Sequence, residues 1–414
     1  MSRLIMILLC AAALVFPFSV AVTNIFLGAA LALGLVSGVW WQGARECWSN
    51  HRLLSIIFCA YMVLLLLGLL WSLDLKWGLH VLGRHWFWLL LPIVVSISLD
   101  KKWRDLFLLS LSAGLAVNLV YCVLQMFGYV EVTTGGSNAE NATGHIGHIG
   151  FGFVYGVWAT WLLHLGLLWS GTQRLIVWGL AAWSYVMVFA AQGRSGYLIA
   201  VILMLSVCLK WVVDSRSWRI AVMFVAMAVL MLFVIALGSG KERLHGTWLA
   251  FTQTQYEAGL DWRDSSDNAI LATQERFQMW KTSINIYLDN PVLGVGTGGF
   301  PVALDKMIAE RRSASRSTAH PHNQYLLNLT RWGPLGLLLL CSLLYFWMRE
   351  GWRMDWRELP MAPLIFLPAL ALAVHALSST SVEEHFSAIL AVLLLGTGLA
   401  GNRIQNEKGD CECN

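Results

Sequence analysis

Long runs of apolar residues dominate this chain and restrict what it can fold into. A helix that crosses a bilayer needs roughly 20 mostly apolar residues, because nothing in hydrocarbon can bond an exposed backbone amide. The sequence contains twelve such runs, at 4–22, 24–42, 53–71, 79–98, 105–128, 149–169, 174–191, 195–213, 218–238, 324–347, 361–380 and 385–401. It therefore predicts an all-α polytopic membrane protein with about 12 transmembrane helices.

The composition excludes several classes of protein. Only 13% of the 414 residues are charged and 57% are hydrophobic, whereas soluble domains are about 25% charged and about 45–50% apolar. A soluble enzyme, a nucleic-acid-binding domain and a disordered protein are therefore excluded. One stretch, 239–323, has ordinary soluble composition. It divides the chain into helices over 1–238, a loop domain with amphipathic helices, helices over 324–401 and a tail over 402–414.

The positive charges predict how the chain is oriented in the membrane. Fifteen of the 28 Lys and Arg residues fall on the side of the N-terminus, and the short loops opposite hold only Lys76 and Arg194. Positive charge marks cytoplasmic loops, while long loops translocate despite their charge. Both termini are therefore expected in the cytoplasm and 239–323 in the periplasm. All eight cysteines lie in helices or on the cytoplasmic side, so no disulfide framework is expected.

Several reactive groups gather on the predicted outer side. Gln192-Gly193-Arg194 forms a short turn between two apolar runs, where an arginine breaks the positive-inside pattern. Such an arginine is a functional candidate, although a side chain that reaches a lipid phosphate is the ordinary alternative. Arg84, just inside the fourth run, is a weaker candidate of the same kind.

Two histidine pairs flank membrane helices on this side. His145 and His148 have a spacing that zinc ligands use, but no Asp, Glu or Cys stands close enough in sequence to complete a site. They are read as interfacial histidines or substrate contacts. His320 and His322 precede the tenth run, where a histidine can act as a general base at neutral pH.

The long loop contains a predicted amphipathic helix. Phe277, Trp280 and Ile284 follow helical spacing, Arg276 lies beside that apolar face, and Asp289-Asn290-Pro291 ends the helix. The glycines between 294 and 299 predict a flexible loop that resembles a phosphate-binding glycine run only loosely.

Together these elements resemble the O-antigen ligase and polymerase superfamily, over roughly residues 190–345. The resemblance rests on the order and spacing of four pieces: Gln192-Gly193-Arg194, Arg276 to Trp280, Asn290 to Gly296, and His322-Asn323 followed by Gly333 and Gly336. The N-terminal half of the chain matches only in its number of helices.

The resemblance implies a glycosyltransferase of lipopolysaccharide biosynthesis in the bacterial inner membrane. It would ligate O-antigen polysaccharide, carried on undecaprenyl diphosphate, to lipid A–core oligosaccharide on the periplasmic face. It also implies a metal-independent enzyme with no cofactor, in which Arg194 and Arg276 bind the leaving diphosphate. The loop has no compact Asp-x-Asp pair that would hold a metal instead.

A base must take the proton of the acceptor hydroxyl, and His322 is the candidate. One base without a covalent nucleophile implies a single displacement with inversion. The remaining predicted substrate-binding residues are His320, Asn323, Gln192, Arg84, Trp280, His145 and His148. Membrane lipids are the other expected partner, and nucleic acid is not expected.

Three alternatives stay open. An O-antigen polymerase of the same superfamily should carry a second basic set, for which Arg311, Arg312 and Arg316 are the candidates. A pilin-type protein O-oligosaccharyltransferase typically has a further C-terminal region, and this chain ends soon after the last run. A secondary transporter would place ionisable residues at mid-membrane and broken helices in both halves, whereas here the ionisable groups gather at one face.

Overall fold

The computed structural model describes residues 1–131, 141–191, 193–215, 268–313, 315 and 317–412. Within these ranges every long element is a helix: α1 (Ser2–Val15), α2 (Val20–Val36), α3 (Val39–Asn50), α4 (Arg52–Leu67), α5 (Leu75–Gly83), the 3-10 helix η1 (Trp86–Leu90), α6 (Leu91–Ser98), α7 (Lys101–Met126), α8 (His148–Leu168), α9 (Gly171–Ala190), α10 (Arg194–Ser215), α13 (Asn268–Asp289), α14 (Phe300–Ala309), α15 (Gln324–Arg353), α16 (Pro363–His375) and α17 (His385–Glu412).

The helices agree with the predicted all-α membrane protein. Six segments of the described chain are long and apolar enough to cross a bilayer: Leu75–Ser98, Lys101–Met126, His148–Leu168, Gly171–Ala190, Arg194–Asp214 and Gln324–Arg353. The bent pair α2 and α3 makes a seventh if it is one span. Shorter apolar helices occupy four further predicted runs, and the run at 218–238 lies outside the described residues. The count of twelve spans therefore stays a prediction.

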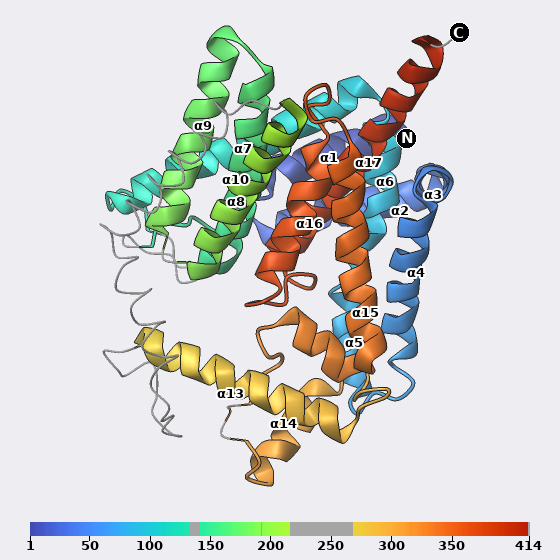
Figure 1. Cartoon of the computed structure of the whole chain (residues 1–414), viewed down its shortest axis with the longest axis vertical. Helices are drawn as coiled ribbons and strands as arrows, with labels where there is room; N and C mark the ends of the chain where they lie inside the picture. The colour runs from blue at the N-terminus through green and yellow to red at the C-terminus, as the bar shows by residue number, and fades with distance from the viewer. Residues whose placement is uncertain (132–140, 192, 216–267, 314, 316, 413–414) are drawn as a thin grey trace.

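The two ends of the helix bundle carry different elements. Both termini lie at one end, and α13 lies across the opposite end together with α14 (Figure 1). This arrangement agrees with the expectation that the termini share one side and the long loop occupies the other. The helix predicted in that loop is present, and α13 ends at Asp289 as its Asp-Asn-Pro sequence predicts. Its buried side includes Met279, Ser283 and Ile286, whereas Ile284 of the predicted apolar face is 45% exposed.

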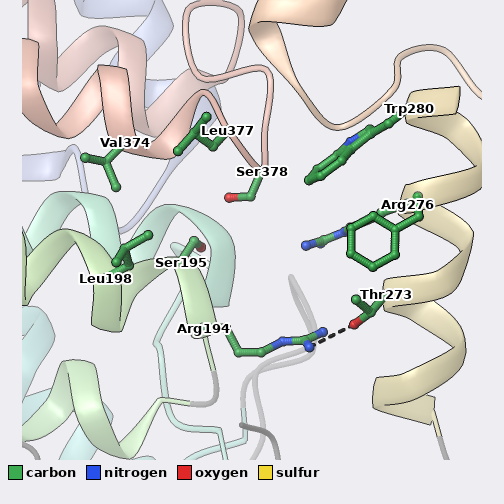
Figure 2. A pocket seen from close by; sticks show the side chains of 10 residues that line it. Arg194, Ser195, Leu198, Thr273, Arg276, Trp280, Val374, Leu377 and Ser378 are labelled. Carbon is green, nitrogen blue, oxygen red and sulfur yellow. Dashed lines mark hydrogen bonds between the residues drawn. The ribbon is translucent and has the colours of Figure 1, made fainter. Parts of the chain in front are cut away.

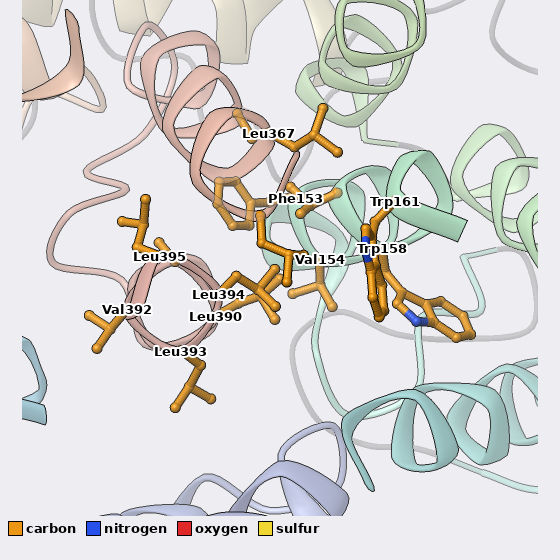
Figure 3. Packing of buried hydrophobic residues seen from close by; sticks show 14 of the residues in the cluster. Phe153, Val154, Trp158, Trp161, Leu367, Leu390, Val392, Leu393, Leu394 and Leu395 are labelled. Carbon is orange, nitrogen blue, oxygen red and sulfur yellow. The ribbon is translucent and has the colours of Figure 1, made fainter. Parts of the chain in front are cut away.

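A central helix, α8, organises the core. Every residue of α8 from Gly150 to Gly166 is buried, which is typical of a helix that is apolar on all sides. Phe153 and Val154 face Leu367 of α16 and Leu390 of α17 in the packed centre of the bundle (Figure 3).

Two facing glycines fix where α10 begins. A Cβ atom on Gly152 of α8 would collide with the Cα atom of Gly196 in α10. Small residues let membrane helices approach this closely. The first residue of α10, Arg194, is therefore anchored beside the core helix although it lies next to a turn.

The glycine-rich segment after α13 is not the flexible loop that its sequence suggests. Its backbone is buried, and Val295 and Gly296 donate hydrogen bonds to the carbonyl oxygens of Thr330 and Arg331, both at 2.9 Å. Gly296 has a φ of +82°, a conformation that favours glycine. That prediction was wrong: the segment is a packed turn that buttresses α15 at its interruption, where Gly333 leaves helical geometry.

Candidate functional site

A cavity of about 210 Å³ opens between α10, α13 and the end of α16 (Figure 2). Its lining consists of Arg194, Ser195, Leu198, Thr273, Arg276, Phe277, Trp280, Val374, Leu377 and Ser378. Arg194, Arg276, Phe277 and Trp280, all named in the sequence analysis, therefore meet at one place, although they come from two elements far apart in the chain. Arg194 and the motif at 276–280 thus line a single cavity.

Arg194 extends across the cavity from the first position of α10. One terminal nitrogen of its guanidinium donates a hydrogen bond to the Thr273 hydroxyl of α13, at 2.9 Å (Figure 2). The arginine that breaks the positive-inside pattern thus contacts the amphipathic helix of the long loop, so both walls of the cavity are joined at this point.

Arg276 points into the same cavity from α13 (Figure 2). Burial lowers the pKa of its guanidinium, and the neighbouring Glu275 partly opposes this shift. An arginine remains charged at any physiological pH even so. Within the part of the chain that the structure describes, Arg276 forms neither an ion pair nor a hydrogen bond, so its charge faces the cavity.

The rest of the lining is mostly apolar. Leu198, Val374 and Leu377 form one wall, and the rings of Phe277 and Trp280 stand on the other in edge-to-face contact, 5.4 Å apart. The Ser378 hydroxyl points into the space between them (Figure 2). Two guanidiniums beside an apolar wall suit an anionic group that is attached to a hydrocarbon chain.

The segment with the two histidines adjoins this cavity. The indole nitrogen of Trp280 donates a hydrogen bond to the Pro321 carbonyl oxygen at 3.1 Å, which ties α13 to the segment. The rings of His320 and His322 meet edge to face with centroids 4.5 Å apart. His322 has a φ of +52°, a conformation that costs energy in a non-glycine residue and is concentrated at functional sites.

The surroundings of His322 keep its imidazole neutral. Burial lowers its pKa to about 3, and the nearby His320 and Arg276 lower it as well. At neutral pH the ring therefore has a free lone pair. Because Arg276 is one cause of the low pKa, an anion bound to that arginine would raise the proton affinity of His322.

Asn323, the other residue of the His-Asn motif, makes structural hydrogen bonds. The Asn323 side chain accepts a hydrogen bond from the Leu326 amide at 3.0 Å and caps α15. Its amide group donates to the Leu377 carbonyl oxygen at 3.2 Å. These contacts join the start of α15 to the cavity wall after α16, and its predicted substrate contact stays a prediction.

The structure contains a buried ion pair that the sequence analysis did not predict, and both of its charges act on His320. Arg331 and Glu383 are only 1% and 3% exposed, and the guanidinium contacts both carboxylate oxygens. Burial alone would raise the pKa of Glu383, but Arg331 holds it below its ordinary value. The signal in the sequence was Glu383-Glu384, two acids between the last two apolar runs.

Arg84 belongs to this buried region and not to the cavity lining. It caps the end of α5, and its charge acts on both Glu383 and His320. Its predicted role as an anion contact stays a prediction. The Glu383 carboxylate lies close enough for the Arg84 charge to lower its pKa.

The earlier histidine pair lies outside the cavity lining. His145 stacks on Tyr121 of α7, with ring centroids 5.3 Å apart. A Cβ atom on Gly193 would approach the His148 carbonyl oxygen to 2.9 Å, so His148 sits beside the turn that carries Arg194. The described residues contain no cluster of three or more metal-ligating side chains, and Gln192 lies outside the described residues.

Arg312, one of the three arginines that a polymerase would need as a second basic set, is already paired with a carboxylate. Both terminal nitrogens of Arg312 donate to the Asp289 carboxylate, at 2.9 and 3.0 Å. Arg311 is exposed, and Arg316 lies outside the described residues. The Arg312 charge is thus neutralised at the end of α13.

One comparison with known proteins covers this site. The family model described as O-antigen ligase matches residues 179–341, a range that holds Arg194, Arg276, His320 and His322 but not the first eight helices. No curated protein matches the chain. The match confirms the resemblance that the motifs carry in the sequence.

Proposed function

Because the family model described as O-antigen ligase matches residues 179–341, we propose that the chain is an O-antigen ligase. It transfers O-antigen polysaccharide from undecaprenyl diphosphate to lipid A–core oligosaccharide. The reaction takes place on the periplasmic face of the bacterial inner membrane. The observation that carries the proposal is the cavity in which Arg194 of α10 and Arg276 of α13 meet beside an apolar wall.

The two arginines bind the diphosphate of the donor. An acceptor hydroxyl attacks the anomeric carbon while the bond from that carbon to the diphosphate oxygen breaks, so negative charge grows on the leaving group. Guanidiniums fixed on two helices stabilise this charge in a partly buried site. The wall of Leu198, Val374 and Leu377 accommodates the first part of the lipid chain.

His322 takes the proton of the acceptor hydroxyl as the new bond forms. Its ring is neutral, so its lone pair is available, but the low pKa makes it a weak base while the cavity is empty. The arrival of the anionic donor beside Arg276 raises that pKa and strengthens the ring as a base. With a single base and one displacement the anomeric configuration inverts. His320, whose ring contacts that of His322, orients the base.

The two guanidiniums take the place of a metal ion in this proposal. Purified enzyme in excess EDTA should therefore retain its activity. Loss of activity that Mg²⁺ or Mn²⁺ restores would contradict the arginine mechanism and point to carboxylates of the long loop.

The lipopolysaccharide of a deletion strain tests the proposed reaction. We expect polymer to disappear from lipid A–core and to remain on the carrier lipid. A single repeat unit left on the core would identify a polymerase instead, and unchanged lipopolysaccharide would reject both. The pairing of Arg312 with Asp289 favours the ligase, since it removes one member of the second basic set.

The proposed topology has its own test. A cysteine at Lys306, whose side chain is 73% exposed on α14, should react with an impermeant thiol reagent in cells whose outer membrane is permeable. A cysteine at Ser49, exposed on α3 at the end with the termini, should react only after lysis. The opposite pattern would reverse the orientation.

A further inference from the structure

The two neighbours of His322 hold its backbone in a strained conformation. The φ of +52° lies in the left-handed region, which a residue with a Cβ atom adopts at an energetic cost. Such a conformation persists only where the surrounding structure fixes it. Pro321 before the histidine and Asn323 after it each form a hydrogen bond with another element of the site. The position of the His322 ring therefore depends on these attachments.

The attachment after His322 belongs to the helix bundle. The Asn323 side chain donates a hydrogen bond to the Leu377 carbonyl oxygen at 3.2 Å. The next residue, Gln324, is fully buried, and its backbone amide donates to the Ala376 carbonyl oxygen at 2.8 Å. The start of α15 is thus fixed to the end of α16 without any contribution from the long loop.

The attachment before His322 comes from α13. The indole nitrogen of Trp280 donates a hydrogen bond to the carbonyl oxygen of the buried Pro321 at 3.1 Å. Further from the histidine, the Thr282 hydroxyl lies 2.7 Å from the Ser313 hydroxyl. The helix α13 therefore holds the segment that precedes α15, and of these two bonds the one from Trp280 is adjacent to His322.

The same helix carries a proposed donor-binding residue. Arg276 and Trp280 lie four residues apart on α13, on one face, and both line the cavity (Figure 2). A single rigid helix thus presents the guanidinium proposed to bind the diphosphate and the indole that holds the segment of the proposed base. The distance between the diphosphate and the base is set along this helix.

We propose that Trp280 is a positioning residue for glycosyl transfer, which fixes the His322 ring relative to the bound diphosphate through the Pro321 carbonyl. This role rests on the proposed function, in which His322 is the base. The indole nitrogen is already bonded to Pro321, so Trp280 acts on the reaction through the protein and not as a hydrogen-bond donor to the substrate.

Trp280→Phe tests this role, because it removes the indole N–H and keeps an aromatic ring in the cavity. At equal protein levels the transfer rate kcat should fall about ten- to a hundredfold, since misplacing a catalytic group by about 1 Å costs up to about 10² in rate. The affinity of the purified full chain for undecaprenyl diphosphate should stay near wild type.

The pH–rate profile separates positioning from a loss of stability. Burial, His320 and Arg276 all lower the pKa of His322, so a ring displaced from this position has a higher pKa. The base must be neutral, and activity is lost as the pH falls through its pKa. In Trp280→Phe the acidic limb of the profile should therefore lie at higher pH than in the wild type.

Trp161→Phe is the matched control. The Trp161 indole also donates to a prolyl carbonyl oxygen, that of Pro360, at 3.0 Å, and it lies outside the cavity lining. Its loss should leave the rate and the pH profile unchanged. Replacing Trp280 by benzothienylalanine, which has sulfur in place of the N–H and nearly the same shape, should reproduce the effects of Trp280→Phe and keeps the test valid if that variant misfolds.

A wild-type rate and pH profile in both Trp280 variants would overturn the positioning role. Weaker binding of undecaprenyl diphosphate with an unchanged kcat would also overturn it, by making Trp280 a substrate contact. An equal loss of rate in Trp161→Phe would attribute the effect to stability. These three outcomes leave the proposed function intact, whereas an active His322→Ala variant would contradict both.

Discussion

Two arginines on the same side of the molecule have opposite surroundings. Arg331, at the interruption of α15, is 1% exposed and contacts the buried Glu383 carboxylate. Arg276, on α13, is half-buried beside a cavity and forms no ion pair with the described residues. The first charge is neutralised by the chain itself, and the second is left for a ligand.

The difference separates a structural arginine from a binding one. A buried charge is tolerated only with a partner, because removing it from water costs several kcal/mol. Where the fold supplies the carboxylate, the arginine joins two elements, here α15 and the segment before α17. Around Arg276 the fold supplies apolar walls, hydroxyls and only the adjacent Glu275 carboxylate, and we propose that the missing partner is an anion from outside. Substitutions at four places in the structure test this contrast.

The largest effect is expected at the buried pair. Arg331→Met leaves the buried Glu383 carboxylate without its ion-pair partner and with only the Gln324 amide as a hydrogen-bond donor, at 3.5 Å. Breaking a buried pair costs about 3–5 kcal/mol of stability. The thermal denaturation midpoint of the purified protein in detergent should fall sharply. The double variant Arg331→Met with Glu383→Leu should regain most of the loss, and a single variant as stable as wild type would refute the structural role.

The cavity arginines should behave in the opposite way. Arg276→Ala or Arg194→Ala removes a charge-assisted contact with the diphosphate, which is worth about 1.5–3 kcal/mol, or roughly ten- to a hundredfold in donor affinity. Thermal stability should hardly change. Arg→Lys should restore little, because an ammonium lacks the planar two-pronged geometry. Donor binding that survives Arg276→Ala would refute its role.

A smaller effect is expected at the residue that holds Arg194 in place. Thr273→Val removes the acceptor of the 2.9 Å hydrogen bond, a contact worth about 1 kcal/mol. Donor affinity should fall about fivefold, and Thr273→Ser should restore it. Tighter donor binding in Thr273→Val would mean that the hydroxyl competes with the substrate for Arg194.

The smallest effect is expected at the exposed pair. Arg312 and Asp289 have side chains 46% and 42% exposed, and solvent screens an exposed pair so that it contributes little to stability. Arg312→Ala should leave stability and glycosyl transfer close to wild type. A large loss of acceptor binding in this variant would instead support the second basic set of a polymerase.

The sequence predicted those parts of the site that local patterns encode. Helical spacing and the Asp-Asn-Pro breaker defined α13, and the positive-inside rule marked Arg194. The pairing of Arg331 with Glu383 is absent from any local pattern, because the two residues are 52 positions apart. The glycines at 294–299 were misread for the same reason, since the backbone groups that order them come from Gly68 and from Thr330 and Arg331.

The His322→Ala variant tests the central claim most directly, by separating binding from chemistry. At equal protein levels we predict that donor affinity stays near wild type while the transfer rate falls by about 10²–10⁴, the usual contribution of a general base. His320→Ala should lose less. Near wild-type turnover in His322→Ala, with an inactive His320→Ala, would show that the base is wrongly assigned. Activity in both variants would contradict the mechanism.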